Sequence, residues 1–393
     1  MSIPEWLRRA LLLALMLYAA SVQAGELRVG VLTMQPGEVF FERFGHNAII
    51  VQDTGSGETV SYNFGYFDPD EPGFVGNFAR GRMMYYLVAL PLQQDLSYYR
   101  SVGRGVDVQW LDLEPARAQA LAASLAERSR PENARYRYDY FTSNCSTQVR
   151  DALDAAMDGA LKRQLSGRSR GITYRSESVR LASPSPWMWI GFDLGLSGYA
   201  DRPLSRWDDA FIPMRLAESL DEAKNADGQP LVAAREQLLP QRLPPEPPAQ
   251  ARRWWPWLLA GLAIACGLLL LRHRPRLVAA LALALWLLCG IGGALLAWLW
   301  GFSAHQAAWA NQNLLLLNPL CLLLLPGGIG ALAGRSPGKM FRWLLAIVAA
   351  LSVLAWLLHW LPTYPQLNQA WIGLLSPIHI ALSMIWSRRQ ANN

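Results

Sequence analysis

The acidic residues of this chain end well before its C-terminus. Of the 393 residues, 30 are Asp or Glu, and the last of these is Glu246. The remainder is rich in Leu, Ala and Trp, and its Lys and Arg stand in short clusters beside long apolar runs. Such clusters are typical of the cytoplasmic ends of membrane-spanning helices. A single soluble domain is therefore excluded, and the formal net charge of +6 does not indicate a nucleic-acid partner.

The apolar runs predict an all-α bundle of about five transmembrane helices. We expect spans near 254–271, 277–300, 314–333, 343–361 and 371–386. Basic clusters at 272–276, 335–342 and 388–389 alternate with connections at 301–313 and 362–370 that lack charged residues. With the basic clusters in the cytoplasm, the region before the first span faces outward. We therefore expect a multi-pass protein of the bacterial cytoplasmic (inner) membrane, with its N-terminal domain in the periplasm.

The N-terminus predicts export of that domain. Arg8 and Arg9 precede an apolar run at 10–20, and Val22 and Ala24 suit a signal-peptidase site. We predict a signal peptide at 1–24, a periplasmic domain at 25–239, a Pro-rich linker at 240–253 and the membrane bundle at 254–393.

The periplasmic domain shows an α+β pattern. β-Rich runs at 27–34, 45–52, 58–66, 82–90 and 104–111 precede predicted helices at 114–129 and 145–158. The short turn at 53–57 predicts a hairpin in which Asp53 faces Glu58, so that position 46 faces about 65. Side chains two residues apart share a face, and Asn63 therefore lies on the same face as His46.

Cys145 and His46 are the residues of this domain best suited to chemistry. Of four cysteines, three lie in apolar runs, and Cys145 alone is exported. An unpaired exported cysteine is either an intermolecular linker or a reactive thiol. Cys145 lies in the first turn of a predicted helix capped by Ser143 or Asn144, where the helix dipole favours the thiolate.

His46 is the only histidine of the exported region and could pair with that thiolate as a catalytic base. We expect Asn63 to orient the imidazole, with Asp68 and Asp139 as alternatives. The Cys145 backbone N–H is a candidate oxyanion donor. No cysteine, histidine and carboxylate cluster has metal-site spacing, so we expect neither a metal nor a cofactor.

Two further groups are candidate substrate-binding residues. Tyr140, Ser143 and Asn144 precede the cysteine directly. His305, Asn311 and Asn313 lie between the second and third predicted spans, on the outer side. The second group could bind a lipid headgroup or substrate at the outer leaflet, or could solvate a loop and cap a helix.

Four strings carry a resemblance to a known family: FGHNAIIV (44–51), YNFGYFD (62–68), NFARGR (77–82) and YRYDYFTSNCSTQVRDAL (136–153). They resemble the N-terminal periplasmic domain family of the Lnb-type lipoprotein N-acyltransferases, over roughly residues 28–220. The order of a strand histidine and a later helix cysteine also resembles circularly permuted NlpC-like thiol enzymes. The resemblance implies a papain-like α+β fold, with Cys145 as nucleophile and His46 as base.

Location and chemistry together suggest a function. We expect a membrane-anchored thiol acyltransferase that moves an acyl chain from a phospholipid or lipoprotein ester to the N-terminal amine of a lipoprotein acceptor. Three alternatives stay open: a cell-wall amidase or peptidase of NlpC-like type, a non-enzymatic envelope assembly factor, and a transporter that uses the bundle.

Overall fold

The computed structural model describes residues 26–249, 252–361 and 365–387, so the predicted signal peptide lies outside the described residues. The chain divides into two compact units. Among the described residues, the first contains 26–68, 84–168 and 205–245. The second contains residues 69–83, 169–204 and the chain from 246 onward. Two segments of the exported region thus cluster with the membrane helices rather than with the rest of that region.

The first unit is built on an antiparallel sheet with the strand order β6-β4-β3-β2-β1-β5-β7. Its strands are β1 (Leu27–Met34), β2 (His46–Asp53), β3 (Thr59–Tyr66), β4 (Met84–Pro91), β5 (Val106–Leu111), β6 (Arg135–Arg137) and β7 (Val232–Leu239). β1 and β2 lie at the centre, where alternating Val, Ile and Leu residues bury both faces. The histidine at the start of β2 therefore lies on a central strand of the sheet.

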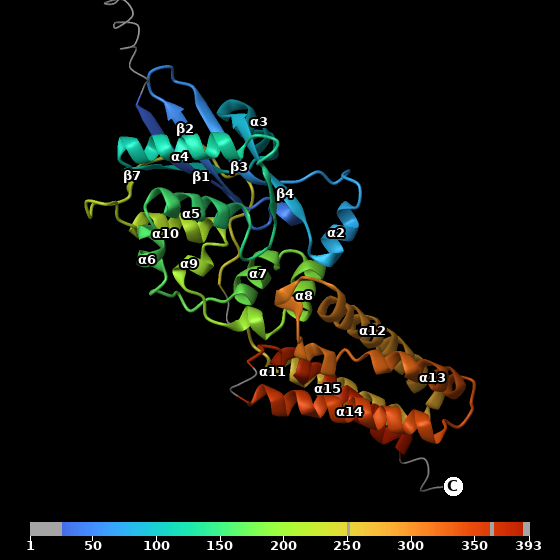
Figure 1. Ribbon diagram of the computed structural model, residues 1–393. Helices are drawn as coiled ribbons and strands as arrows, with labels where there is room; N and C mark the ends of the chain where they lie inside the picture. Colours follow the sequence, from blue (N-terminus) through green and yellow to red (C-terminus); the bar gives the residue numbers. More distant parts are fainter. Residues whose placement is uncertain (1–25, 250–251, 362–364, 388–393) are drawn as a thin grey trace, which may run out of the picture. The chain divides into compact units, whose positions relative to one another are not determined.

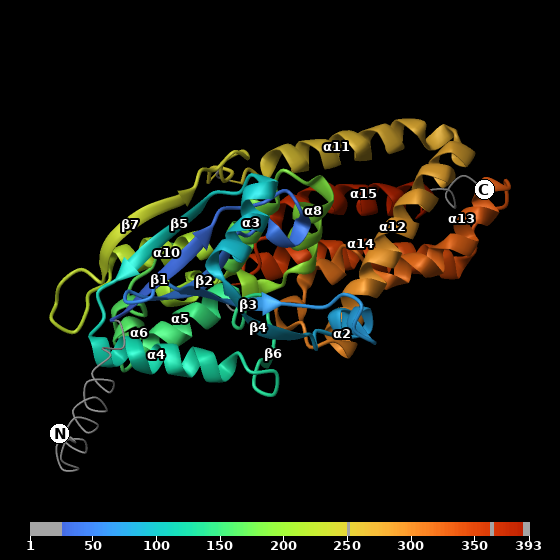
Figure 2. The ribbon, with the colours of Figure 1, turned by 90° about the horizontal axis from the view of Figure 1, so that it is seen from above.

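Helices cover both faces of this sheet (Figures 1 and 2). Those of the first unit are η1 (Phe40–Glu42), α3 (Leu92–Val102), α4 (Pro115–Arg128), α5 (Cys145–Ala156), α6 (Ala160–Leu165), α9 (Arg206–Asp209) and α10 (Pro213–Glu222). One apolar core packs Val29, Val31 and Ile49 against α4, α5 and α10. The other packs Leu32 and Ile50 against α3. The α+β fold class is confirmed.

The hairpin register is as predicted. The Asp53 amide donates to the Glu58 carbonyl, and Ala48 pairs with Asn63. A β-bulge interrupts the pairing of β3 with β4 between Phe64 and Tyr66. The bulge lies at Gly65, which has a φ of +98° and is suited to this backbone because it lacks a Cβ.

The second unit contains the membrane helices. They are α11 (Trp255–Leu270), η3 (Leu271–His273), α12 (Pro275–Phe302), η4 (Gln306–Ala308), η5 (Gln312–Leu315), η6 (Pro319–Leu324), α13 (Leu325–Leu332), α14 (Lys339–His359) and α15 (Gln369–Ser387). Within the described residues, four segments are long and apolar enough to cross a membrane: Trp255–His273, Pro275–Phe302, Lys339–His359 and Gln369–Ser387. A fifth span is possible if one bent pair counts. The helical bundle with four or five candidate spans agrees with the expectation.

The third apolar run differs from a plain span. Gln306–Leu315 and Pro319–Leu332 meet at an angle of 43°, and most of the run before Leu325 is 3-10 helix. Pro319 lacks an N–H, and the Asn318 side chain caps the turn that follows by accepting from the Leu320 amide. These two residues break the helix where composition alone predicts continuity.

Glycine allows two of the spans to approach closely. A Cβ added to Gly261 of α11 would lie 2.4 Å from the Gly373 carbonyl oxygen of α15. Small residues at such crossings permit close helix packing in membranes.

Three short helices of the exported region belong to this second unit. They are α2 (Phe74–Arg80), α7 (Tyr174–Ala182) and α8 (Pro186–Gly195), with η2 (Gly198–Asp201) directly after α8.

Candidate active site

Cys145 is the first residue of α5, and the turn before it is firmly capped. The Asn144 side-chain oxygen accepts from the Thr147 backbone N–H at 2.9 Å, and the Thr147 hydroxyl accepts from the Asn144 backbone N–H at 2.8 Å. Of the two predicted caps, Asn144 is the one used. This reciprocal capping box fixes the helix N-terminus, so the thiol lies where unpaired N–H groups and the helix dipole stabilise negative charge.

His46 contacts both Cys145 and Asn63. Its Nε2 lies 3.0 Å from the Asn63 Oδ1, and its side chain is hydrogen-bonded to Cys145. Because Nε2 is engaged by Asn63, Nδ1 is the ring nitrogen left for the thiol. The structure thus brings together the three residues that the sequence singled out.

The electrostatics of the pair favour its charged form. Burial by itself would lower the pKa of His46, but the charge of Cys145 and its hydrogen bond, followed by Asp95 and Asn63, raise that pKa above 6.5. Burial by itself would raise the pKa of Cys145, but the charge and hydrogen bond of His46 and the Asn47 and Ser146 backbone N–H groups lower it below 9.0. Both directions stabilise a thiolate–imidazolium pair.

Asp95 lies behind Asn63 as a buried carboxylate. Its Oδ2 accepts from the Asn63 Nδ2 at 2.9 Å and from the Ser61 hydroxyl at 2.6 Å. These bonds fix which end of the Asn63 amide faces His46, because the Nδ2 is taken by the carboxylate and the Oδ1 is left for the imidazole. Sequence analysis missed Asp95, since it lies in the ordinary helix α3 and contacts Asn63 across 32 residues.

A second polar link holds the histidine strand against the cysteine helix. The Ser146 hydroxyl, next to Cys145, lies 2.8 Å from the Asn47 Oδ1 and 2.6 Å from the Ala210 carbonyl, and its one proton is shared between these acceptors. Asn47 adjoins His46. The Asn47 amide in turn donates to the Leu32 carbonyl and the Thr33 hydroxyl. Asn47 and Ser146 are fully buried. They tie the two reactive residues together one position away from each, which the sequence did not reveal.

Tyrosines lie beside the thiol. The Tyr136 hydroxyl is buried and has no hydrogen-bond acceptor among the described residues, while the Gly65 backbone N–H is directed at its oxygen. A Cβ on Gly65 would lie 3.5 Å from the Cys145 Cβ and 3.9 Å from this hydroxyl, so the glycine keeps the space between them open. Burial first, and then the charge of Cys145, raises the pKa of both Tyr136 and Tyr138. Both hydroxyls therefore stay protonated and can donate a hydrogen bond.

Ser143 and Asn144, also predicted near the cysteine, donate to backbone carbonyls of the same unit. The Ser143 hydroxyl donates to the Arg137 carbonyl, and the Asn144 amide donates to the Tyr140 and Phe211 carbonyls. Asp139 accepts from the Phe141 and Thr142 amides in the turn before α5. The imidazole partner is thus Asn63, while the Asp139 carboxylate shapes the loop.

The polar residues of the outer loop contact protein backbone. The His305 Nε2 lies 3.0 Å from the carbonyls of Phe78 and Ala79 at the end of α2. The Asn311 amide donates to the Leu194, Gly195 and Leu196 carbonyls, and the Asn313 amide to the Leu194 carbonyl. His305 thus contacts helix α2, and Asn311 and Asn313 contact the C-terminal end of α8, both within the second unit. Among the described residues, no group of three or more His, Cys, Asp and Glu side chains could hold a metal.

These features define a multi-pass membrane protein whose periplasmic N-terminal domain carries a paired cysteine and histidine. Two family models match the chain: the Lnb N-terminal periplasmic domain over residues 15–181 and the Lnb transmembrane domain over residues 254–391. The chain belongs to the Lnb family, as the sequence resemblance indicated. No curated protein and no solved structure matches it significantly.

Proposed function

We propose that this protein is a thiol acyltransferase of the bacterial inner membrane that acylates the N-terminal amine of lipoproteins. The observation that carries the proposal is the hydrogen-bonded Cys145–His46–Asn63 set at the N-terminus of α5, in a chain that also has membrane-spanning helices. A thiolate beside an imidazolium is the minimum for covalent catalysis. Anchoring in the membrane gives the thiol access to esters whose acyl chains lie in the bilayer.

The first half-reaction forms an acyl-enzyme. The Cys145 thiolate attacks the carbonyl carbon of a phospholipid or lipoprotein ester and forms a C–S bond. The ester C–O bond then breaks, and the leaving oxygen takes the proton from the His46 imidazolium. The products are a thioester on Cys145 and a lipid alcohol.

The second half-reaction transfers the chain. The amine nitrogen of the lipoprotein attacks the thioester carbonyl while neutral His46 accepts its proton. The C–S bond breaks, an amide forms, and the thiolate and imidazolium are restored. Asn63, held by Asp95, keeps the imidazole oriented through both steps.

The negative charge on the carbonyl oxygen needs donors in both half-reactions. The Ser146 and Asn47 backbone N–H groups point at the Cys145 sulfur and are candidate donors. The buried Tyr136 hydroxyl, which has no protein acceptor among the described residues, is a third.

Mass spectrometry of lipoprotein N-terminal peptides tests the proposed reaction. In a host that lacks other N-acylating enzymes, cells carrying the chain should add an N-linked acyl chain that cells carrying an empty vector lack. Unchanged N-termini together with altered wall fragments would favour the amidase or peptidase alternative. Unchanged N-termini together with an unchanged wall would favour the two non-enzymatic alternatives, the assembly factor and the transporter.

The charged pair predicts alkylation of Cys145 at mildly acidic pH. Thiolate forms as the pH rises through the lowered pKa of Cys145, and the imidazolium is lost only as the pH rises through the raised pKa of His46. At pH 6.5 an ordinary thiol with a pKa near 8.5 is about 1% thiolate. Iodoacetamide should therefore modify Cys145 at pH 6.5 much faster than it modifies glutathione.

His46→Ala is the matched control, and the modified peptide should be identified by mass. The variant should lose the reaction at pH 6.5 and recover it at pH 9. Equal rates in wild type and His46→Ala at pH 6.5 would show that the imidazole does not activate the thiol.

Asp95→Asn should shift the pH profile of transfer. Removing the carboxylate removes one cause that raises the pKa of His46, so the limb of the profile governed by imidazolium loss should move to lower pH. We expect the maximal rate to fall about 10-fold, part of the roughly 10²–10⁴ that a positioned base contributes. Asp227→Asn, in an exposed turn, is the control. A lower maximal transfer rate with an unchanged pH profile would show that Asp95 has only a structural role.

A further inference from the structure

Helix α8 in the exported region has the composition of a membrane-associated segment. Its sequence is PWMWIGFDLG, in which Asp193 is the only charged residue and is almost fully buried. Trp189, Ile190 and Leu194 pack against the apolar core of the membrane helices, and the Trp189 ring lies 6.3 Å from the Trp257 ring. One face of α8 is therefore part of the bundle.

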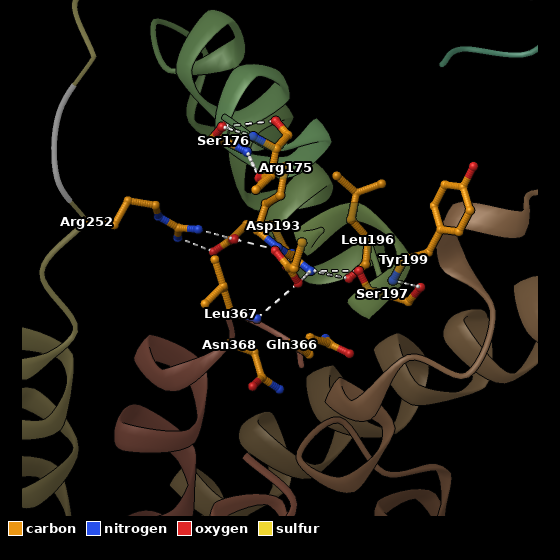
Figure 3. Close-up of polar contacts among 12 residues, drawn as sticks. Arg175, Ser176, Asp193, Leu196, Ser197, Tyr199, Arg252, Gln366, Leu367 and Asn368 are labelled. Atoms are coloured by element: carbon orange, nitrogen blue, oxygen red, sulfur yellow. Dashed lines mark hydrogen bonds and ion pairs between the residues drawn. The ribbon is translucent and has the colours of Figure 1, made fainter. Parts of the chain in front are cut away.

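A network of charges fixes α8 at this place (Figure 3). The Asp193 carboxylate forms a two-pronged ion pair with Arg252, just before α11, and accepts from the Trp371 Nε1 at 2.7 Å, at the start of α15. Arg175 of α7 donates to the Asp193 carbonyl at 2.6 Å and pairs with Asp201 at 2.7 Å. The buried charge is thus fully compensated, and α8 joins the starts of two spans.

Asparagine side chains complete the attachment at the C-terminal end of α8. The last carbonyls of a helix have no partner within the helix. Here the Asn311 and Asn313 amides donate to the Leu194, Gly195 and Leu196 carbonyls at 2.8–3.2 Å. The two asparagines precede the third apolar run, so all the segments that hold α8 lie at one end of the bundle.

That end is the outer one. The basic clusters at 272–276 and 335–342 follow α11 and α13, at the opposite end of the bundle. Trp254 and Trp255, which begin the first span, are 42% and 50% exposed, as expected of an aromatic belt at the membrane interface. Helix α8 is fixed to this same level.

The remaining face of α8 points away from the bundle. Trp187 is 68% exposed, and Gly191, four residues later on the same side of the helix, is also exposed. We propose that this face lies in the outer interface of the membrane and contacts phospholipids at the level of their headgroups and glycerol. Exposed Trp254 and Trp255 at the same end of the bundle favour lipid over a protein partner, because such tryptophans are typical of the membrane interface. The inference does not depend on the proposed acyl transfer.

Photo-crosslinking in phospholipid nanodiscs tests this surface. The full chain should carry benzoylphenylalanine at Gly191, in nanodiscs of phosphatidylethanolamine and phosphatidylglycerol. A Cβ at Gly191 meets no atom within 4 Å, so the larger side chain fits without disturbing α8. After irradiation, the peptide that contains residue 191 should carry the mass of one phospholipid.

Two control positions set the background. Ser56, exposed in the β2–β3 turn, has no reason to meet lipid, and Met188, buried on α8, should crosslink within the protein. We expect at least five times more lipid adduct at 191 than at either control, and the same excess with the probe at Trp187. The proposal would be overturned if probes at 187 and 191 gave no more lipid adduct than the probe at Ser56. It would also be overturned if both probes crosslinked only to protein.

Discussion

Replacing Cys145 by Ala should abolish N-acylation of lipoproteins and leave the protein folded. Without the thiol no acyl-enzyme can form, so we expect the rate to fall by about 10³-fold or more. Wild-type protein incubated with the ester donor alone should carry one acyl chain on the peptide that contains Cys145. The measurement is intact-peptide mass spectrometry, combined with transfer to an amine acceptor.

The chain supplies its own control for this substitution. Cys266 is exposed on α11, far in sequence from His46, and Cys266→Ala should retain both the acyl adduct and transfer. Transfer that persists in Cys145→Ala at more than a tenth of the wild-type rate would exclude the thioester mechanism. Cys145→Ser should also be inactive, because the hydroxyl is not ionised by a neighbouring imidazole as readily as the thiol.

Replacing Asp193 by Ala should strongly destabilise the membrane unit. The carboxylate is 1% exposed and holds Arg252 and the Trp371 Nε1 together. Breaking a buried pair by removing one partner costs about 3–5 kcal/mol, and we expect the low end because Arg252 can turn toward solvent. The midpoint of thermal unfolding in detergent should fall by roughly 6–12 °C.

Asp227→Ala again serves as the control, because its carboxylate lies in an exposed turn of the other unit. Its midpoint should stay within about 1 °C of wild type, as is usual for surface substitutions. Asp193→Asn keeps an acceptor for Trp371, so its unfolding midpoint should lie between those of Asp193→Ala and Asp227→Ala. An Asp193→Ala midpoint equal to that of the control would mean that the buried ion pair contributes nothing net.

The sequence predicted the central geometry where short-range rules apply. A five-residue turn set the β2–β3 register, and the register placed Asn63 on the face of His46. The cap at Asn144 followed from the preferences of helix N-termini. Asp95, Asn47 and Ser146 escaped notice because each acts through a partner at least 32 residues away, and neither periodicity nor local composition encodes such contacts.

The same distinction explains the membrane region. Hydropathy and charge predicted about five spans, and four of these are continuous helices in the structure. They did not predict the bend at Asn318 and Pro319 in the third run. Asn311 and Asn313 looked like residues that could meet a ligand, because polar side chains near a span are unusual. Their actual partners are the α8 carbonyls, more than 100 residues earlier in the chain.

The division of the chain into units also limits how the protein can be taken apart. The backbone passes from one unit to the other at residues 68–69, 83–84, 168–169, 204–205 and 245–246. A truncation at the Pro-rich stretch would therefore strip α8 of Arg252, Trp371 and its apolar neighbours, and would leave a buried carboxylate and two tryptophans facing water. The periplasmic domain and its membrane anchor are consequently not exchangeable modules. A recombination event that joined this domain to a different set of membrane helices would also have to supply new contacts for α8.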